Sequence, residues 1–332
     1  MLKVGIVGLG AISSTQIEAI SRLSDMAEIK ALCDCDSSKK VNIENTNFYT
    51  DVEEMLKKEN LDCLHICLPH YLHKPTTILA AKYGVNVFME KPAGINSEEI
   101  TEMEKIVNDS GIKVGICFQN RFNATTQKAQ EIIRSGKYGK VKGCKAIVTW
   151  DRRENYYTKD LWRGKKDKAG GGVMITQAIH SLDLMKLFCG DIEWVKGLTG
   201  NLLLENIEVE DTACAYIQFK NGIGGIFYGT VTHCFNSSVE IEIVLEKGVL
   251  QIKNNKLTYI DCDGETIFAK DNPDTMVVEG EYQAMNLFYR KLMNLEGGDY
   301  ISLEEAKQDN ILIEKIAQSA QEKRKVYWND VS

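Results

Sequence analysis

Short apolar runs alternate with helical patterns over roughly the first 120 residues. The runs have the length of buried strands and cover residues 2–7, 28–34, 61–69, 85–92 and 112–118. Helical spacing is found at 11–23, at 52–58, at 72–83 and after Ser97, which is expected to cap its helix. Strands that alternate with helices in this way predict a doubly wound parallel sheet with helices on both faces.

Beyond residue 120 the pattern changes to consecutive strands. A helix is predicted over 123–135, and further helices over 173–189, 279–295 and 303–323. The strands are predicted at 140–150, 192–204, 209–220, 223–235, 238–247, 248–253, 256–261 and 265–269. Turn signals such as Asn221-Gly222 connect them, which indicates a large, mostly antiparallel sheet. We therefore predict an α/β domain at 1–120 and an α+β domain at 121–332.

Composition narrows the class of protein. The net charge is −7 and there is no basic stripe, which argues against nucleic acid as a partner. No apolar segment is long enough to span a membrane, and no signal peptide precedes the first strand, so a cytoplasmic location is expected. The ten cysteines are scattered without a CxxC pair, which favours reduced structural thiols and no metal site. The open face of the large sheet predicts a homodimer or homotetramer.

A glycine-rich turn joins the first strand to the first helix. Its sequence is Gly8-Leu9-Gly10-Ala11-Ile12-Ser13, with Ser13 where a third glycine often stands. Gly8 allows the tight turn, and Gly10 lets a pyrophosphate approach the helix N-terminus. Asp34 ends the second strand, where a carboxylate can bind a ribose 2′-hydroxyl and repel a 2′-phosphate. The Rossmann pattern therefore favours NAD over NADP, although a related domain that binds flavin, S-adenosylmethionine or nothing stays open.

Further polar segments follow the carboxyl ends of predicted strands, where ligands bind in such sheets. They contain Leu68, His70 and His73, then Glu90-Lys91-Pro92, then Asn120-Arg121-Phe122. Trp162-Arg163-Gly164 and a triple glycine that precedes His180 lie later in the chain. With these motifs the chain resembles the glucose–fructose oxidoreductase, inositol dehydrogenase and rhizopine catabolism (Gfo/Idh/MocA) family over nearly its whole length.

The resemblance implies an NAD(P)-dependent dehydrogenase or reductase that acts on CH–OH groups. It also implies that the Lys91–Pro92 peptide bond is cis and that His73 shapes the cofactor pocket. The cofactor contacts expected on this basis are Gly8, Gly10, Ala11, Ile12, Asp34, Leu68, His70, His73, Glu90, Lys91, Asn120, Trp162 and Arg163. The substrate contacts expected are Lys91, Asn120, Arg121, Arg163, Thr176 and His180.

Oxidation of a secondary alcohol requires a base for the hydroxyl proton and stabilisation of charge at the oxygen. Lys91 is the first candidate for both tasks, and His180 is the second. The family often has a carboxylate four residues before this histidine, but this chain has Thr176, predicted on the same helix face. Asp183 could orient His180 instead. The choice of base between Lys91 and His180 therefore stays open.

The leading hypothesis is hydride transfer between nicotinamide and a secondary alcohol or ketone of a sugar, cyclitol or sugar derivative. An NAD-dependent glycoside hydrolase on the same scaffold is one alternative, because it would oxidise, eliminate and reduce without net consumption of NAD. A non-catalytic NAD-sensing regulator is another, since the family's carboxylate is missing at position 176. Arg121 and Arg163 could bind a substrate carboxylate or phosphate, or form salt bridges between the domains.

Overall fold

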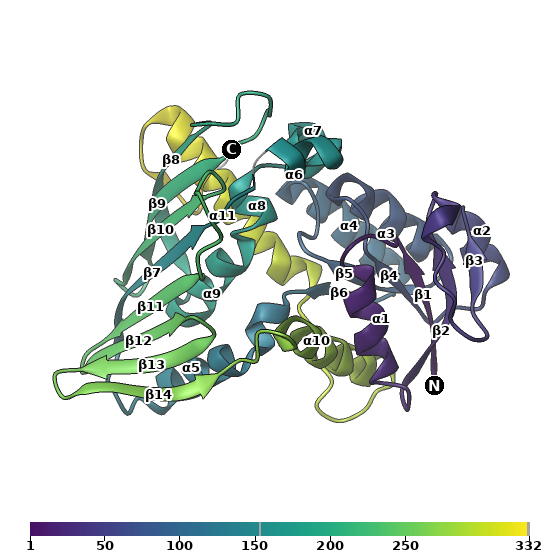
Figure 1. Ribbon diagram of the computed structural model, residues 1–332, viewed down its shortest axis with the longest axis horizontal. Helices are drawn as coiled ribbons and strands as arrows, with labels where there is room; N and C mark the ends of the chain where they lie inside the picture. The colour runs from purple at the N-terminus through teal and green to yellow at the C-terminus, as the bar shows by residue number, and fades with distance from the viewer. Residues whose placement is uncertain (153, 331–332) are drawn as a thin grey trace. The chain divides into compact units, whose positions relative to one another are not determined.

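The computed structural model describes residues 1–152 and 154–330, which form two compact units (Figure 1). Unit 1 contains Met1–Phe122 and Asp274–Gln308. Unit 2 contains Asn123–Pro273 and the residues from Asp309 onward. The predicted division at residue 120 lies close to the first change of unit, but segment 274–308 groups with the N-terminal residues.

Unit 1 is built on a parallel sheet of six strands in the order β3-β2-β1-β4-β5-β6. The strands are β1 (Leu2–Val7), β2 (Ala27–Cys33), β3 (Asn47–Tyr49), β4 (Cys63–Ile66), β5 (Asn86–Glu90) and β6 (Val114–Cys117). This order is that of a doubly wound Rossmann sheet, and it confirms the predicted fold of the N-terminal residues. The short strand β3 was not predicted.

The helices of unit 1 include four between these strands and one that comes much later in the chain. They are α1 (Ser13–Ser21), α2 (Val52–Lys58), α3 (His73–Lys82), α4 (Ser97–Ser110) and α10 (Met276–Leu292), with 3-10 turns η1 (Ser37–Lys39), η2 (His70–Leu72) and η3 (Gln119–Phe122). The prediction that Ser97 caps α4 is wrong. The cap is Asn96, whose side-chain oxygen accepts a hydrogen bond of 2.8 Å from the Glu99 N–H, and Ser97 is the first helical residue.

Helix α10 packs on unit 1 although it is distant in sequence. Its apolar stripe, which includes Met285, Phe288 and Tyr289, is buried in the same cluster as β1 and α1. A Cβ at Gly115 of β6 would lie 2.9 Å from the Phe288 ring, so the glycine makes room for that side chain. Figure 1 shows α10 beside α1. The predicted domain assignment of this helix differs from the structure because the Rossmann sheet offers its stripe an apolar partner.

Unit 2 is built on a sheet of nine strands in the order β14-β13-β12-β11-β7-β10-β9-β8-β15. They are β7 (Val141–Thr149), β8 (Ile192–Gly200), β9 (Thr212–Phe219), β10 (Gly224–Thr230), β11 (Glu240–Leu245), β12 (Gly248–Lys253), β13 (Lys256–Asp261), β14 (Gly264–Lys270) and β15 (Val326–Tyr327). All neighbours run antiparallel except β7 and β10, which are parallel. The predicted mostly antiparallel sheet is thus confirmed, and β15 is a strand that was not predicted.

Helices cover one face of this sheet. They include α5 (Ala124–Ser135), α9 (Ile179–Cys189) and α11 (Leu303–Glu322), of which α11 begins in unit 1 and continues in unit 2. Shorter helical segments, most of them not predicted, are α6 (Glu154–Lys159), η4 (Leu161–Gly164), α7 (Lys166–Ala169) and α8 (Val173–Thr176). The inward-facing side chains of β7, β9 and β11 alternate with exposed ones, as a sheet covered on one face requires.

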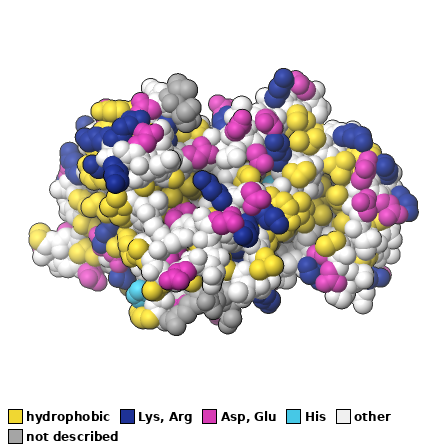
Figure 2. Space-filling view, turned by 90° about the horizontal axis from the view of Figure 1, so that it is seen from above, with side chains coloured by type: hydrophobic (Ala, Val, Ile, Leu, Met, Phe, Trp, Pro, Cys, Tyr) yellow, Lys and Arg dark blue, Asp and Glu magenta, His cyan; other side chains and the backbone are white. Residues whose placement is uncertain are grey.

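The surface carries charges of both signs, and Figure 2 shows basic and acidic side chains interspersed over the face in view. Among the described helices, none combines the length and apolar character that a membrane crossing demands. All ten cysteines lie in described parts of the chain and are free thiols, as predicted.

Candidate active site

The glycine turn has the backbone that a dinucleotide phosphate requires. Gly8 has a φ of +88°, and a Cβ there would lie 2.5 Å from the Cys67 carbonyl oxygen, so both conformation and space demand glycine. A Cβ at Gly10 would meet nothing within 4 Å, and no side chain caps the N-terminus of α1. An open, uncapped helix N-terminus behind this turn fits an anionic pyrophosphate.

Ser13 and Asp34 support the turn. Ser13 is buried, and its hydroxyl donates a hydrogen bond of 2.7 Å to the Gly10 carbonyl. The Asp34 carboxylate accepts bonds from the Leu9 N–H at 2.7 Å and the Asp36 N–H at 2.9 Å. Burial raises the pKa of Asp34, but these two N–H groups and the nearby Lys39 ammonium outweigh it and lower the pKa. These interactions therefore favour an ionised carboxylate at the end of β2.

Lys91 follows the last residue of β5, and Gly8 follows the last residue of β1 in the same sheet. The Lys91–Pro92 bond is cis, as the resemblance implied. His73 is fully buried behind this segment, with Nδ1 2.8 Å from the Pro92 carbonyl oxygen and Nε2 2.8 Å from the Leu68 carbonyl oxygen. His73 therefore connects the segments that follow β4 and β5.

Other predicted residues of unit 1 have partners within it. The His70 ring is buried, with its centroid 5.9 Å from that of His73. Arg121 pairs with Glu305 and lies over the Phe118 ring. The Arg121 guanidinium thus forms its ion pair inside unit 1, which differs from the predicted salt bridge between the domains. Asn120 is half-buried in η3, just beyond β6.

In unit 2 the predicted helix over 173–189 is broken. Thr176 ends α8 and His180 lies in the first turn of α9, so the two do not share one helix face as predicted. The Thr176 hydroxyl donates back to the Gly172 carbonyl at 2.6 Å, and the Ala178 N–H bonds to the Val173 carbonyl five residues earlier. Such bonds compete with regular helical pairing and interrupt the helix. Asp183 lies three residues after His180 in α9 and is buried.

The break is held by residues that the sequence did not single out. The Gln177 amide donates a hydrogen bond of 2.9 Å to the Tyr156 hydroxyl, which also contacts the Arg163 guanidinium. Arg163 bonds to Asp160 at 3.1 Å and stacks 4.8 Å from the Trp162 ring centroid. Gln177, Tyr156 and Arg163 thus form one hydrogen-bonded row in unit 2. A cavity of about 370 Å³ lies beside it, bordered by Leu161, Gly164 and Ile207 among others.

Sequence reasoning also missed a buried polar network in unit 1. Gln16 and Glu281 are fully buried, and each occupies a position on the apolar stripe of its helix. A polar residue on an apolar stripe is the signal that could have revealed both. Glu90, expected as a cofactor contact, has its side chain buried, and it accepts a hydrogen bond of 2.7 Å from the Gln16 amide.

Comparison with known proteins agrees with this arrangement. Residues 2–118 match the oxidoreductase family with an NAD-binding Rossmann fold, and residues 126–251 match the GFO/IDH/MocA C-terminal domain. The WlbA dehydrogenase from Bordetella pertussis, solved with NADH and UDP-GlcNAcA, is 26% identical with a TM-score of 0.88, covering 100% of this chain and 98% of that one.

Curated relatives extend the likeness. Myo-inositol 2-dehydrogenase from Thermotoga maritima is 24% identical over 269 residues, which is 78% of this chain and 77% of the relative. The 2,7-anhydro-N-acetylneuraminate hydratase from Mediterraneibacter gnavus is 25% identical over 266 residues, 78% and 68% of the two chains. Among the curated relatives compared, the match spans from 53% to 83% of the relative's own length. With both halves matched, this chain belongs to the GFO/IDH/MocA family of oxidoreductases and contains that family's NAD-binding Rossmann domain.

Proposed function

We propose that the protein is a dehydrogenase or reductase that transfers hydride between nicotinamide and a secondary alcohol or ketone of a sugar, cyclitol or sugar derivative. The observation that carries this proposal is the placement of Lys91 directly after β5 in the sheet whose β1 ends in the glycine turn. Ligands of such sheets bind outside the carboxyl ends of the strands. The dehydrogenases among the relatives support this class of substrate.

The N-terminal turn would hold the dinucleotide. In this assignment Gly8, Gly10, Ala11 and Ile12 bind the pyrophosphate, and Asp34 accepts a hydrogen bond from a ribose hydroxyl. His70, Leu68, Asn120, Trp162 and Arg163 stay predicted cofactor contacts. When bound, NAD supplies the hydride chemistry, and the protein supplies orientation and proton transfer.

Lys91 is assigned to the proton of the substrate hydroxyl. Its ammonium can stabilise the developing charge on the oxygen, or its neutral amine can take the proton. His180 and Asp183, neighbours on α9, are assigned to the substrate side together with Thr176, Asn120 and Arg163. The experiment below tests the requirement for Lys91, whichever of these two tasks it performs.

A Lys91→Met variant tests the assignment directly. Turnover of any polyol or sugar that the wild type oxidises should fall by at least ~100-fold, the usual range for loss of a general acid or base. NADH should still bind in calorimetry, because the glycine turn is intact. Lys82→Met, which removes an exposed lysine of the same unit, is the matched control and should keep full activity. Full turnover by Lys91→Met would refute the role of Lys91.

A redox-neutral reaction on the same scaffold is the second candidate, and the hydratase relative is the observation that favours it. Such an enzyme would transform its substrate in the presence of catalytic NAD without accumulation of NADH. Product analysis by mass spectrometry alongside NADH absorbance separates the two functions. Product formed at many turnovers per NAD would replace the dehydrogenase proposal.

We further propose that the uncovered face of the nine-stranded sheet binds a second copy of the chain. Apolar side chains project from this face on adjacent strands, and Leu198 and Ile226 are 65% and 58% exposed. Ile226 pairs with Tyr216, whose ring stacks on Trp194 at 5.3 Å. Large exposed apolar patches are rare on monomeric proteins, which favours a partner on this face.

A further inference from the structure

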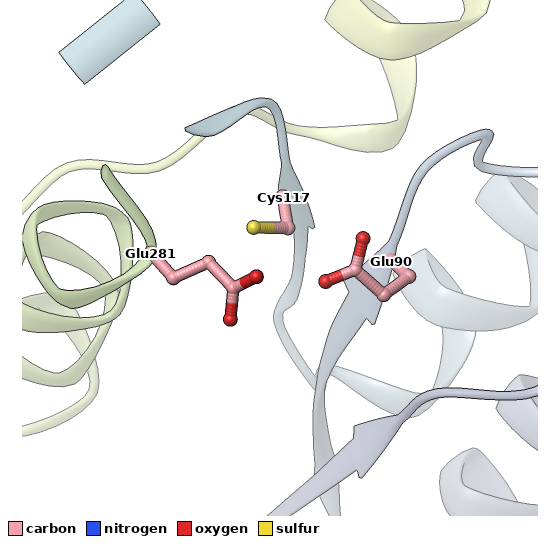
Figure 3. Close-up of side chains that lie close together, drawn as sticks. All are labelled: Glu90, Cys117 and Glu281. Carbon is pink, nitrogen blue, oxygen red and sulfur yellow. The ribbon is translucent and has the colours of Figure 1, made fainter. Parts of the chain in front are cut away.

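Three buried side chains of unit 1 point toward one another (Figure 3). Glu90 ends β5, Cys117 ends β6, and Glu281 lies in the second turn of α10. Their carboxylate and thiol atoms lie within 4.8 Å of one another. Glu281 is fully buried, and neither of its carboxylate oxygens has a hydrogen-bond partner among the described residues.

Two carboxylates at this distance and depth cannot both be ionised. Removal from water penalises each charge, and their mutual repulsion adds to that penalty in a low-dielectric interior. Besides the Lys91 ammonium, which acts on Glu90, the pair therefore needs one more positive charge, either as a proton or as a bound cation. The surrounding hydrogen bonds show which of the two carboxyl groups accepts hydrogen bonds from the protein.

A chain of three hydrogen bonds leads to Glu90. Tyr289 Oη lies 2.7 Å from His65 Nε2, His65 Nδ1 lies 2.7 Å from Gln16 Oε1, and Gln16 Nε2 donates to Glu90 Oε1 at 2.7 Å. An amide oxygen only accepts, so His65 Nδ1 carries the proton. Burial lowers the pKa of His65 to about 3, so its Nε2 is bare and accepts from the tyrosine. Every donor in the chain is thus oriented toward Glu90.

The two glutamates have different electrostatic surroundings. Burial raises the pKa of Glu90, and the Lys91 ammonium and the Gln16 amide offset only part of that rise. Burial and the Glu90 charge raise the pKa of Glu281 to about 10, with no opposing group. The other titratable groups that face the pair are the thiols of Cys67 at the end of β4 and Cys117 on β6, and burial raises the pKa of both well above the usual value.

We propose that Glu281 is a neutral carboxylic acid in the folded protein, and that its proton is the counter-charge which keeps Glu90 ionised beside Lys91. Glu281 is then a positioning residue for the charge state of the Lys91 amine, and the importance of that amine rests on the function proposed above. A proton is the simpler counter-charge, because burial keeps the thiols of Cys67 and Cys117 protonated and leaves a cation only the two carboxylates as charged ligands.

Infrared spectroscopy of the protein without ligand tests the protonation directly. The carbonyl stretch of a protonated carboxylic acid is separate from carboxylate bands. Wild type at neutral pH should show one such band that Glu281→Gln abolishes and that Glu90→Gln and Glu279→Gln retain. The band of wild type should persist from about pH 5 to about pH 9. This measurement does not depend on any variant being able to fold. A band lost in Glu90→Gln but kept in Glu281→Gln, an absent band, or stoichiometric divalent metal in the purified protein would overturn the proposal.

The link to Lys91 is tested without any substrate. Only a neutral amine reacts with an acetylating reagent, so the acetylation rate of Lys91, read by peptide mass spectrometry against Lys82, reports its charge. Glu90→Gln removes a neighbouring anion and should accelerate acetylation of Lys91 about tenfold, one pKa unit. Glu281→Gln replaces one neutral group with another and should change the rate less than about twofold. Equal acceleration in both variants, or in neither, contradicts the proposal whether or not the protein is a dehydrogenase.

Discussion

Replacing Glu281 with glutamine should raise the free energy of unfolding at neutral pH, and the gain should grow as the pH rises. In the folded protein the pKa of Glu281 is raised to about 10, mainly by burial, whereas an unfolded glutamate titrates near its ordinary value of 4.5. Below pH 4.5 Glu281 is therefore mainly protonated in both the folded and the unfolded chain, and its titration does not lower the free energy of unfolding. Between the two pKa values the unfolded chain has released a proton that the folded chain must take up again.

The magnitude follows from proton linkage. Each pH unit above 4.5 costs wild type about 1.4 kcal/mol, which amounts to about 3 kcal/mol at pH 7 and about 5 kcal/mol at pH 8.5. Glutamine has the same shape and does not titrate, so it avoids this cost. Other titrating groups cancel when the variant is compared with wild type at the same pH.

Urea unfolding followed by circular dichroism at several pH values measures the difference. The quantity to plot is the unfolding free energy of Glu281→Gln minus that of wild type, and its slope should be positive from pH 5 to pH 9. Glu279→Gln, an exposed residue of the same helix paired with Arg22, is the control and should give a flat line. A flat line for Glu281→Gln, or a negative slope, would mean that Glu281 is ionised in the folded protein and would refute the reasoning.

Three further predictions concern other parts of the molecule. Gly10→Ala should abolish NADH binding in calorimetry without a change in melting temperature, because the added Cβ meets only open space in the protein. Gly8→Ala should lower both the NADH affinity and the melting temperature. Retained NADH binding by Gly10→Ala would exclude a pyrophosphate at this turn. Because burial lowers the pKa of His65 to about 3, the free energy of unfolding of wild type should fall by about 1.4 kcal/mol for each pH unit below 6.5. His65→Gln should lack this part of the acid sensitivity in urea titrations. Parallel curves of unfolding free energy against pH for the two proteins would count against a neutral His65. Ile226→Lys should reduce the molar mass seen by light scattering, unlike Val277→Lys, and an unchanged oligomer would remove the sheet face from consideration.

Local patterns were sufficient for the Rossmann half. The apolar runs, the turn at Gly8 and the acid at Asp34 are all set by neighbours in sequence, so the doubly wound fold and the position of the turn followed from general rules. The break after Thr176 could not be predicted in this way. It depends on the hydrogen bond from the Thr176 hydroxyl to the Gly172 carbonyl. It also depends on Gly172 itself, because a Cβ at that position would lie 1.7 Å from the Glu210 carbonyl oxygen.

Contacts between distant segments account for the rest. Glu281 lies 191 positions after Glu90 in sequence, so no local pattern places their carboxylates together. The assignment of α10 failed for the same reason, since an apolar stripe specifies that a helix is buried but not which sheet buries it. The candidate catalytic residues were found from their motif, whereas the polar groups behind them become visible only when the core is assembled.

The chain passes between the two units three times, after residues 122, 273 and 308. The nucleotide-binding sheet therefore receives helix α10 only after residues 123–273, which belong to unit 2, have been synthesised. During synthesis the Rossmann strands must wait with part of their apolar surface unprotected, which is a period of exposure to chaperones and proteases. A fragment that ends at residue 122 would retain the glycine turn and Lys91, but it would leave the site of Phe288 and Tyr289 open to water.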